Sequence, residues 1–255
     1  MLLPHDEVGT GPTIVLLHAG IADRTMWAEH LVPIAAAGYR VMAMDLPGFG
    51  QAPAAPQDAP WNDVVETLDA LSVERCVLVG NSFGGAVALR VAVVAPRRVV
   101  ALMVISAPPP NVAPSPELRA AWEAEESALE RGDIDAAVDA VVDAWTLPSA
   151  PAALRQRVAE MQRRAFELQL AGPDATESVD PIEGPATLAT IQVPALVVVG
   201  ELDMIDFRRG AETIARHLPH ANHVVIAGTK HLAPLEQPEQ FRGLLLRFLS
   251  EHKPR

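Results

Sequence analysis

The chain has 255 residues, 49% of them hydrophobic, which is enough to build a sizeable core in one large domain or two small ones. Asp and Glu number 32 against 20 Lys and Arg, so the net charge is −12. An acidic chain without a basic stripe is poorly suited to bind nucleic acid or an anionic membrane, and we expect neither as a partner.

The single cysteine, Cys76, opens an apolar segment and is expected to be a small buried hydrophobe. One cysteine cannot form an internal disulfide, which fits a reducing compartment. The first residues, MLLPHDEV, show neither the basic segment nor the apolar run of a signal peptide, and no stretch has the length of a membrane span. These features predict a cytoplasmic protein.

Short apolar segments recur along the chain without polar alternation, as expected of strands that are buried on both faces. The predicted strands cover residues 13–19, 39–46, 76–80, 99–106, 195–200 and 223–228. Helical patterns lie between most of them, at residues 26–37, 61–71, 83–95, 207–217 and 238–250. This alternation predicts an α/β fold with a doubly wound, mostly parallel sheet.

The alternation stops between residues 108 and 190. A proline-rich segment, SAPPPNVAPSPE, is followed by helical patterns at residues 116–131, 134–145 and 151–170, and the loop GPDATESVDPIEGP then leads back to the sheet. We interpret residues 108–190 as a helical lid, or cap, inserted after the strand at 99–106. Residues 1–107 and 191–255 then form the main domain. The alternative is a helical domain with its own core and no role at the site.

A serine follows the apolar part of the segment VLVGNSFGG at residues 77–85. Gly80, Ser82 and Gly84 fit the pattern G-x-S-x-G between a strand and a helix, where a sharp, crowded turn needs small neighbours. Such a turn lifts the Ser82 hydroxyl above the carboxyl edge of the sheet, where open α/β sheets bind ligands. The helix that starts there directs backbone N–H groups toward developing negative charge. Ser82 is therefore the predicted nucleophile.

A serine hydroxyl is a weak nucleophile at neutral pH and needs a histidine as its base and a carboxylate to orient that histidine. Among eight histidines, His231 is the best placed, on the loop GTKHLAPLEQP after the last predicted strand. We expect Lys230, its neighbour, to point to solvent. His5, His30 and His252 are expected to be surface residues.

The carboxylate should follow another strand, and ALVVVGELDMID offers Glu201, Asp203 and Asp206. We predict Asp203, because Asp206 precedes a helix and is better explained as its N-cap. The histidines show no paired ligand spacing, so we expect neither a metal nor a cofactor.

Two backbone N–H groups should stabilise the oxyanion that forms when a serine attacks a carbonyl. Phe83, the residue after the serine, is predicted to supply one of them. Gly20, in the loop LLHAGIAD, is predicted to supply the other, with Ile21 as the alternative. His18 is expected to brace this loop.

The segments LLHAG, DLPGFG, GNSFGG, VVVGELD and GTKHLAPLEQPEQF, in this order, resemble the α/β-hydrolase superfamily. The resemblance spans residues 8–107 and 191–250, leaves the lid unmatched, and is closest to small, lidded esterases and enol-lactone hydrolases. It implies about seven strands, because MLLPHDEVGTG has room for one strand where the family has a hairpin. The family often has glycine where Ala19 stands, and a serine where Gln51 and Ala52 follow DLPGFG.

The predicted function is a serine hydrolase, of carboxylesterase or lactonase type, that cleaves a small and apolar substrate through an acyl-enzyme. Serine at the turn sets the chain apart from dehalogenase-like and epoxide-hydrolase-like members, which use aspartate there. The alternatives on the same triad are biosynthetic acyl transfer or cyclisation, C–C bond hydrolysis, lyase chemistry, and a ligand-binding receptor. The candidate substrate-binding residues are Ile21, Trp27, Trp122, Trp145, Phe166 and Leu232.

Overall fold

The computed structural model describes residues 1–110 and 112–252. At its centre lies a seven-stranded sheet with the strand order β1-β3-β2-β5-β6-β8-β9. Its strands are β1 (His5–Val8), β2 (Thr13–Leu17), β3 (Arg40–Met44), β5 (Cys76–Asn81), β6 (Val99–Ile105), β8 (Ala195–Gly200) and β9 (Ala221–Ile226). β1 pairs with β3 antiparallel, and every other neighbouring pair in this sheet is parallel. The prediction of a doubly wound, mostly parallel sheet of about seven strands is confirmed.

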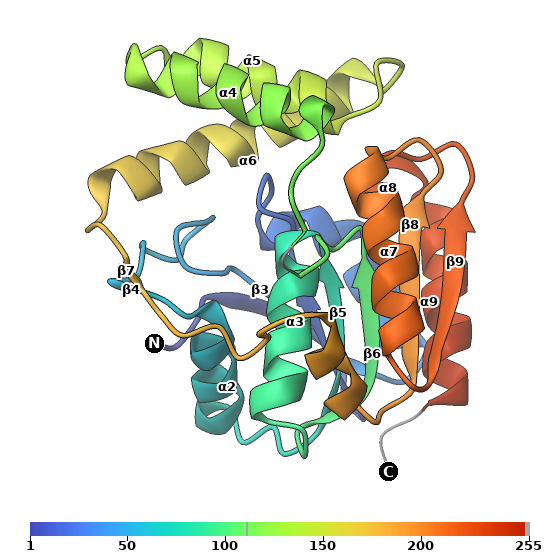
Figure 1. Cartoon of the computed structure of the whole chain (residues 1–255). Helices are drawn as coiled ribbons and strands as arrows, with labels where there is room; N and C mark the ends of the chain where they lie inside the picture. The colour runs from blue at the N-terminus through green and yellow to red at the C-terminus, as the bar shows by residue number, and fades with distance from the viewer. Residues whose placement is uncertain (111, 253–255) are drawn as a thin grey trace.

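Helices cover both faces of the sheet (Figure 1). On one face α2 (Pro60–Ala70) packs beside α3 (Phe83–Val94), and α7 (Ile205–His217) lies along β8 and β9. On the other face α1 (Ala28–Ala36) packs against α9 (Pro238–Glu251). All five agree with helices predicted from the sequence. Among the described residues, no helix is both long and apolar enough to cross a bilayer.

The chain reverses its direction across the sheet at β2. β3 lies on one side of β2 and β5 lies on the other side. The connections that leave the carboxyl ends of β2 and β5 therefore diverge, and such a switch point is where open α/β sheets bind ligands. The segment LLHAG leads out of β2 and the segment GNSFGG leads out of β5, so both lie at this switch point.

The chain segment between β6 and β8 contains three long helices, α4 (Pro116–Glu130), α5 (Ile134–Trp145) and α6 (Ala152–Ala171). We call residues 108–190 the helical insert. α5 packs against both α4 and α6, and the three helices lie across the carboxyl ends of the strands (Figure 1). Gly132 has a φ of +70°, and the Asp133 side chain accepts a hydrogen bond from the next helix, so these two residues separate α4 from α5 as the sequence predicts.

Five short elements carry no periodic pattern and are not predicted by the sequence. They are the 3-10 helices η1 (Arg24–Trp27) and η2 (Pro185–Thr190), the short helix α8 (Ala233–Glu236), and the two-residue strands β4 (Gln57–Asp58) and β7 (Thr176–Glu177). β4 and β7 pair in parallel, and η2 packs against α7 and α3. The last part of the helical insert therefore runs back along the sheet domain.

One predicted surface residue is buried. His30 has no exposed surface, and its imidazole Nε2 lies 3.0 Å from the Pro234 carbonyl oxygen. The rings of Trp27 and Phe241 pack against it. Burial lowers the pKa of His30, so the neutral form is favoured in the fold. The expectation of a surface position for His30 is wrong, because it lies on the face of α1 that contacts α9.

Candidate active site

Ser82 lies between β5 and α3 in a strained backbone conformation, with φ 50° and ψ −112°. A residue other than glycine in such a region costs on the order of 1–3 kcal/mol, and the surrounding structure must impose it. The Ser82 N–H donates to the Ile105 carbonyl oxygen at 2.7 Å, and the Ser82 carbonyl oxygen accepts from the Ala86 N–H at 2.9 Å. The turn is thus held by the neighbouring strand and by the helix that it starts.

The glycines around Ser82 are required by close backbone contacts. A Cβ atom at Gly80 would lie 2.2 Å from the Gly84 carbonyl oxygen, and one at Gly84 would lie 2.4 Å from the Leu17 carbonyl oxygen. Neither distance is compatible with a side chain. The G-x-S-x-G pattern is therefore explained by the packing of the turn against β2.

His231 and Asp203 form a buried pair at the ends of β9 and β8. His231 Nδ1 lies 3.1 Å from each carboxylate oxygen of Asp203, and both residues are almost completely buried. A carboxylate accepts hydrogen bonds, so Nδ1 donates and the neutral ring carries its lone pair on Nε2. The Met204 N–H donates to Asp203 at 2.9 Å, and the Asn81 amide donates to the His231 carbonyl oxygen at 3.2 Å.

Asp206 does not cap α7. The N-cap residue of α7 is Met204, and Asp206 lies in the first turn of the helix. Its carboxylate accepts from the N–H and the hydroxyl of Ser115, at 2.7 and 2.6 Å. The predicted N-cap role of Asp206 is wrong, because its side chain fastens the start of α4 to α7.

Two aromatic rings enclose the His231 imidazole. The ring centroid of Trp145 lies 4.5 Å from that of His231, and the ring centroid of Phe207 lies 4.4 Å from it. Trp145 ends α5 of the helical insert, whereas Phe207 belongs to α7. The insert therefore contributes one of the two rings that restrict the rotation of His231.

The loop after β2 lies against the start of α3. A Cβ atom at Gly20 would lie 3.4 Å from the Phe83 Cβ, so these two residues are in direct contact. Among the described residues, the N–H groups of Phe83, Gly20 and Ile21 have no hydrogen-bond partner. His18 Nδ1 donates to the Ala19 carbonyl oxygen at 2.8 Å, and its Nε2 accepts from a backbone N–H after β3 at 2.9 Å. His18 thus joins the two loops, and burial lowers its pKa.

A cavity of about 400 Å³ lies between the sheet and the helical insert. We call it the main cavity. It is lined by Gly20, Ile21, Phe49, Ser82, Phe83, Pro108, Trp122, Glu125, Trp145, Gln162, Phe207 and His231. Ser82 and His231 share this space, and the described residues contain no hydrogen bond between them. Hydrogen bonds between a nucleophile and its base are often long before substrate binds.

Three of the six candidate substrate-binding residues lie on this lining. Ile21, Trp122 and Trp145 line the main cavity. The remaining candidates are buried elsewhere and do not line it: Trp27, Phe166 and Leu232. The lining residues that the sequence analysis missed are Phe49, Pro108, Glu125, Gln162 and Phe207. Only the position of Phe49 in the DLPGFG motif offered a signal.

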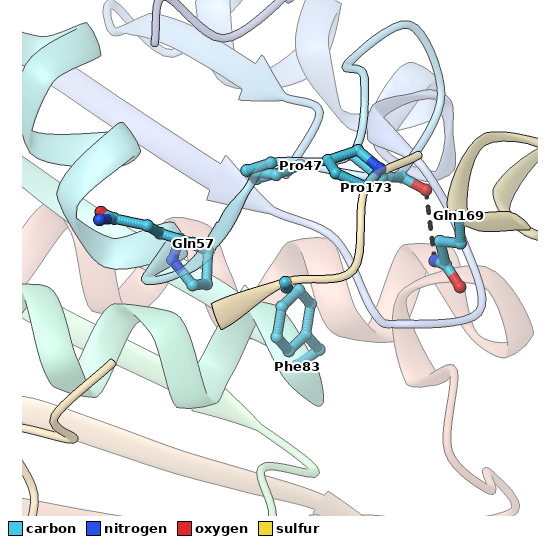
Figure 2. Close-up of a pocket in the computed structure, with 10 residues that line it drawn as sticks. Pro47, Gln57, Phe83, Gln169 and Pro173 are labelled. Carbon is cyan, nitrogen blue, oxygen red and sulfur yellow. Dashed lines mark hydrogen bonds between the residues drawn. The ribbon is translucent and has the colours of Figure 1, made fainter. Parts of the chain in front are cut away.

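A second cavity, of about 220 Å³, also borders Phe83 (Figure 2). The loop after β3 lines it with Pro47, β4 lines it with Gln57, and the end of α6 lines it with Gln169. The Gln169 amide donates to the Gly48 carbonyl oxygen at 3.3 Å and so connects α6 to that loop. The two cavities are neighbours around Phe83, whose ring is shared by their linings.

Lys230 does not point freely to solvent. Its Nζ lies 3.3 Å from the Thr146 carbonyl oxygen at the end of α5, and burial lowers its pKa. The carboxylate of Glu236 accepts from the N–H groups of Lys230 and Leu147, at 2.6 and 3.3 Å. The expectation for Lys230 is wrong, because the end of α5 covers the loop that carries His231.

Comparison with known proteins identifies the family. The model of the alpha/beta hydrolase fold family matches residues 12–238. The pimeloyl-[acyl-carrier protein] methyl ester esterase of Aeromonas hydrophila is 28% identical over 96% of this chain and 98% of its own. A thermophilic esterase from Thermogutta terrifontis has a TM-score of 0.78 at 25% identity, covering 98% of this chain and 94% of its own.

A solved structure described as an N-acyl homoserine lactone degrading enzyme has a TM-score of 0.77 at 26% identity, covering 96% of each chain. No cluster of three or more metal-ligating side chains is found among the residues that the structure describes. The relatives thus include esterases and lactone-degrading enzymes. The chain belongs to the α/β-hydrolase fold family and is a hydrolase.

Proposed function

We propose that this chain is a serine hydrolase that cleaves a carboxylic ester or lactone of a small, mostly apolar molecule. The observation that carries the proposal is the buried His231–Asp203 pair, whose imidazole lines the same cavity as Ser82 on its strained turn. The names of two relatives, a methyl ester esterase and a lactone-degrading enzyme, support this class of substrate.

In the first step, His231 Nε2 takes the proton of Ser82 as the serine oxygen attacks the carbonyl carbon. The electron pair of the carbonyl moves onto its oxygen, which accepts hydrogen bonds from the N–H groups of Phe83 and Gly20. Asp203 keeps the proton on Nδ1 and stabilises the imidazolium. The tetrahedral intermediate then breaks its bond to the leaving oxygen, which takes the proton from Nε2 and departs as an alcohol.

In the second step, water replaces the alcohol. His231 Nε2 takes a proton from water as its oxygen attacks the acyl-enzyme, and the same N–H groups bind the second oxyanion. The bond to Ser82 breaks, and the serine oxygen recovers its proton from His231. A carboxylic acid is released, and no group outside the chain is consumed apart from water.

The walls of the main cavity support a mostly apolar substrate. Seven of its lining residues are large and apolar or are proline: Ile21, Phe49, Phe83, Pro108, Trp122, Trp145 and Phe207. A volume of about 400 Å³ falls at the lower end of the range for small-molecule sites. Molecules with a short acyl chain and a small alcohol therefore fit the proposal.

Labelling with a fluorophosphonate probe, followed by intact-mass measurement, tests the nucleophile. The wild type should gain one adduct and Ser82→Ala none. Ser106→Ala is the matched control, because Ser106 also has a positive φ, of 47°, but lies buried after β6 and does not line the main cavity. A Ser82→Ala protein that is still labelled, or still turns over esters at the wild-type rate, would contradict the proposal.

A panel of esters, thioesters and lactones separates the alternatives. A labelled enzyme that forms product only with an added alcohol or amine would be an acyltransferase, and one that releases a lactone from a hydroxy-acyl substrate would be a cyclase. Labelling without turnover of any ester or lactone would favour C–C hydrolysis or lyase chemistry. A folded wild type that is not labelled would favour a ligand-binding receptor.

A further inference from the structure

The wall of the main cavity that belongs to the helical insert contains two polar side chains that the proposed chemistry does not use. Glu125 lies on α4 and Gln162 lies on α6, and both line the main cavity. Two different helices therefore bring a carboxylate and an amide to the same space. Because the two residues lie far apart in the sequence, they meet at the cavity only through the packing of their helices.

Among the residues that the structure describes, neither side chain has a hydrogen-bond or ion-pair partner. Gln162 is only 3% exposed, and its Oε1 is buried with no hydrogen-bond partner. Within the described residues, Glu125 makes neither a hydrogen bond nor an ion pair. Burial alone raises the pKa of Glu125, without an opposing contribution from a neighbouring donor or cation.

Glu236 is a half-buried glutamate whose hydrogen bonds explain its position, and it serves as a comparison for Glu125. Burial raises its pKa too, but its carboxylate accepts hydrogen bonds from two backbone N–H groups. One belongs to Lys230 in the His231 loop and the other to Leu147 in the insert, so these bonds connect the two regions. Buried polar groups are nearly always bonded, and an exception calls for a ligand or another explanation. Gln162 Oε1 is such an exception, and the half-buried Glu125 lines the same cavity without a bonding partner among the described residues.

We propose that Glu125 and Gln162 form a polar subsite that binds a hydrogen-bond donor, a hydroxyl or an ammonium group, on an otherwise apolar substrate. The carboxylate accepts from this group, and the amide, which carries both a donor and an acceptor, completes its hydrogen bonds. This proposal rests on the proposed function and names its substrate class. The described lining contains no Lys or Arg, so a substrate carboxylate would meet Glu125 without a compensating cation.

Matched substrates test the subsite. One series consists of p-nitrophenyl esters of heptanoate, ω-hydroxyhexanoate, ω-ammoniohexanoate and the adipate half-ester, which differ at one terminal group. A second series places the same groups on the alcohol, because either end of the substrate could face the insert. In at least one series, the wild type should prefer a hydroxyl or ammonium over the methyl group by about tenfold or more in kcat/KM and disfavour the carboxylate.

Three variants assign the preference to residues. Glu125→Gln should abolish an ammonium preference and reduce a hydroxyl preference, and Gln162→Leu should reduce both through KM. Glu126→Gln is the control, because Glu126 is exposed on the same helix. A preference for ammonium over hydroxyl would identify an amine ligand, and the reverse order an alcohol. Equal kcat/KM values for all terminal groups, or ratios that Glu125→Gln leaves unchanged, would overturn the subsite.

A binding measurement keeps this test separate from the proposed hydrolysis. ω-Aminohexanol, 1,6-hexanediol and heptanol are each titrated into Ser82→Ala protein, which cannot form an acyl-enzyme. The amino alcohol, the diol of the same length, or both should bind about tenfold more tightly than heptanol, and Glu125→Gln should remove the difference. Identical binding would overturn the subsite even if the esters are hydrolysed. Selective binding without ester turnover would support the subsite and overturn the proposed function instead.

Discussion

The main cavity has two walls that are built differently. The wall from the sheet, which we call the sheet wall, carries Ser82 and His231, with Asp203 bonded to His231, and backbone or side-chain hydrogen bonds hold each of the three. The wall from the helical insert, which we call the insert wall, presents Glu125 and Gln162, for which the described part of the chain supplies no bonding partner. In our proposals, the sheet wall carries out the chemistry and the insert wall selects what is bound.

Trp145 is the exception to this division. It belongs to the insert, yet its ring packs on the imidazole of His231 on the sheet wall. The bonds from Lys230 and Glu236 to the end of α5 connect the same two regions. A change at this junction should affect chemistry, although it lies on the insert wall.

The largest effect is expected at the carboxylate of the sheet wall. Asp203→Asn should lower kcat by roughly three to four orders of magnitude, because an amide no longer stabilises the imidazolium or selects the Nδ1–H form of His231. Steady-state kinetics with a p-nitrophenyl ester measure this loss. Asp206→Asn is the matched control, since Asp206 bonds to Ser115 and not to His231. Equal losses in the two variants would contradict the assignment of Asp203.

A steric change in the turn should test how strongly the sheet wall is packed. Gly84→Ala should lower the free energy of unfolding by about 3 kcal/mol or more, because its Cβ would lie 2.4 Å from the Leu17 carbonyl oxygen. Urea denaturation measures the change. Gly243→Ala in α9 should instead raise the free energy of unfolding by about 0.5–1 kcal/mol, because no atom lies within 4 Å of its Cβ position. A small effect at Gly84 would show that the turn is able to relax.

The sheet wall was easier to predict from the sequence than the insert wall. The turn at Ser82 and the loop at His231 are specified by local patterns, since glycine spacing and strand ends set their positions. The structure places Asp203, and not Asp206, against the imidazole, in agreement with the sequence-based choice. The N-cap role assigned to Asp206 failed because its partner, Ser115, is 91 residues away.

The insert wall was largely beyond prediction. Glu125 lies in a helix of alternating Ala and Glu, a pattern typical of a solvent-exposed face, and its burial depends on how α4 docks. Gln162 is one of many polar residues in a helix rich in Arg and Gln, so its burial is not visible in the sequence. The same holds for the environments of His30 and Lys230. Burial of a polar side chain is a tertiary property, so periodicity within one helix does not reveal it.

A change at Trp145 should sharpen the division by testing its exception. Trp145→Leu should lower kcat about tenfold, because His231 loses one of the rings that restrict it. Trp122→Leu, on the same wall but 47% exposed and without a ring contact to His231, should act mainly on KM. Comparing kcat and KM for the two variants measures the distinction. A kcat loss of equal size in Trp122→Leu would mean that the insert acts on chemistry as a whole.

The smallest effect is a dependence of stability on pH, and two buried histidines of the sheet domain should contribute with the opposite sign to Glu125 of the insert wall. Burial lowers the pKa values of His18 and His30 below 6.5, so the unfolded chain binds protons that the folded chain does not. Their contribution to the free energy of unfolding therefore falls as the pH drops through 6.5 toward the lowered values, by at most about 1.4 kcal/mol per pH unit for each histidine. Burial raises the pKa of Glu125, so its protonation favours the fold as the pH falls.

Urea denaturation between pH 7.5 and 5.5 measures the two contributions. His30→Gln should flatten the loss of stability on acidification, since glutamine does not titrate, while His223→Gln, at an exposed position, should leave the slope unchanged. Glu125→Gln should make the loss steeper at pH values near the raised pKa of Glu125, because it removes the opposing contribution. If His30→Gln steepened the slope, or Glu125→Gln flattened it, these groups would not be held in the forms that their burial favours. The assignment of opposite pH contributions to the buried histidines and to Glu125 would then be wrong.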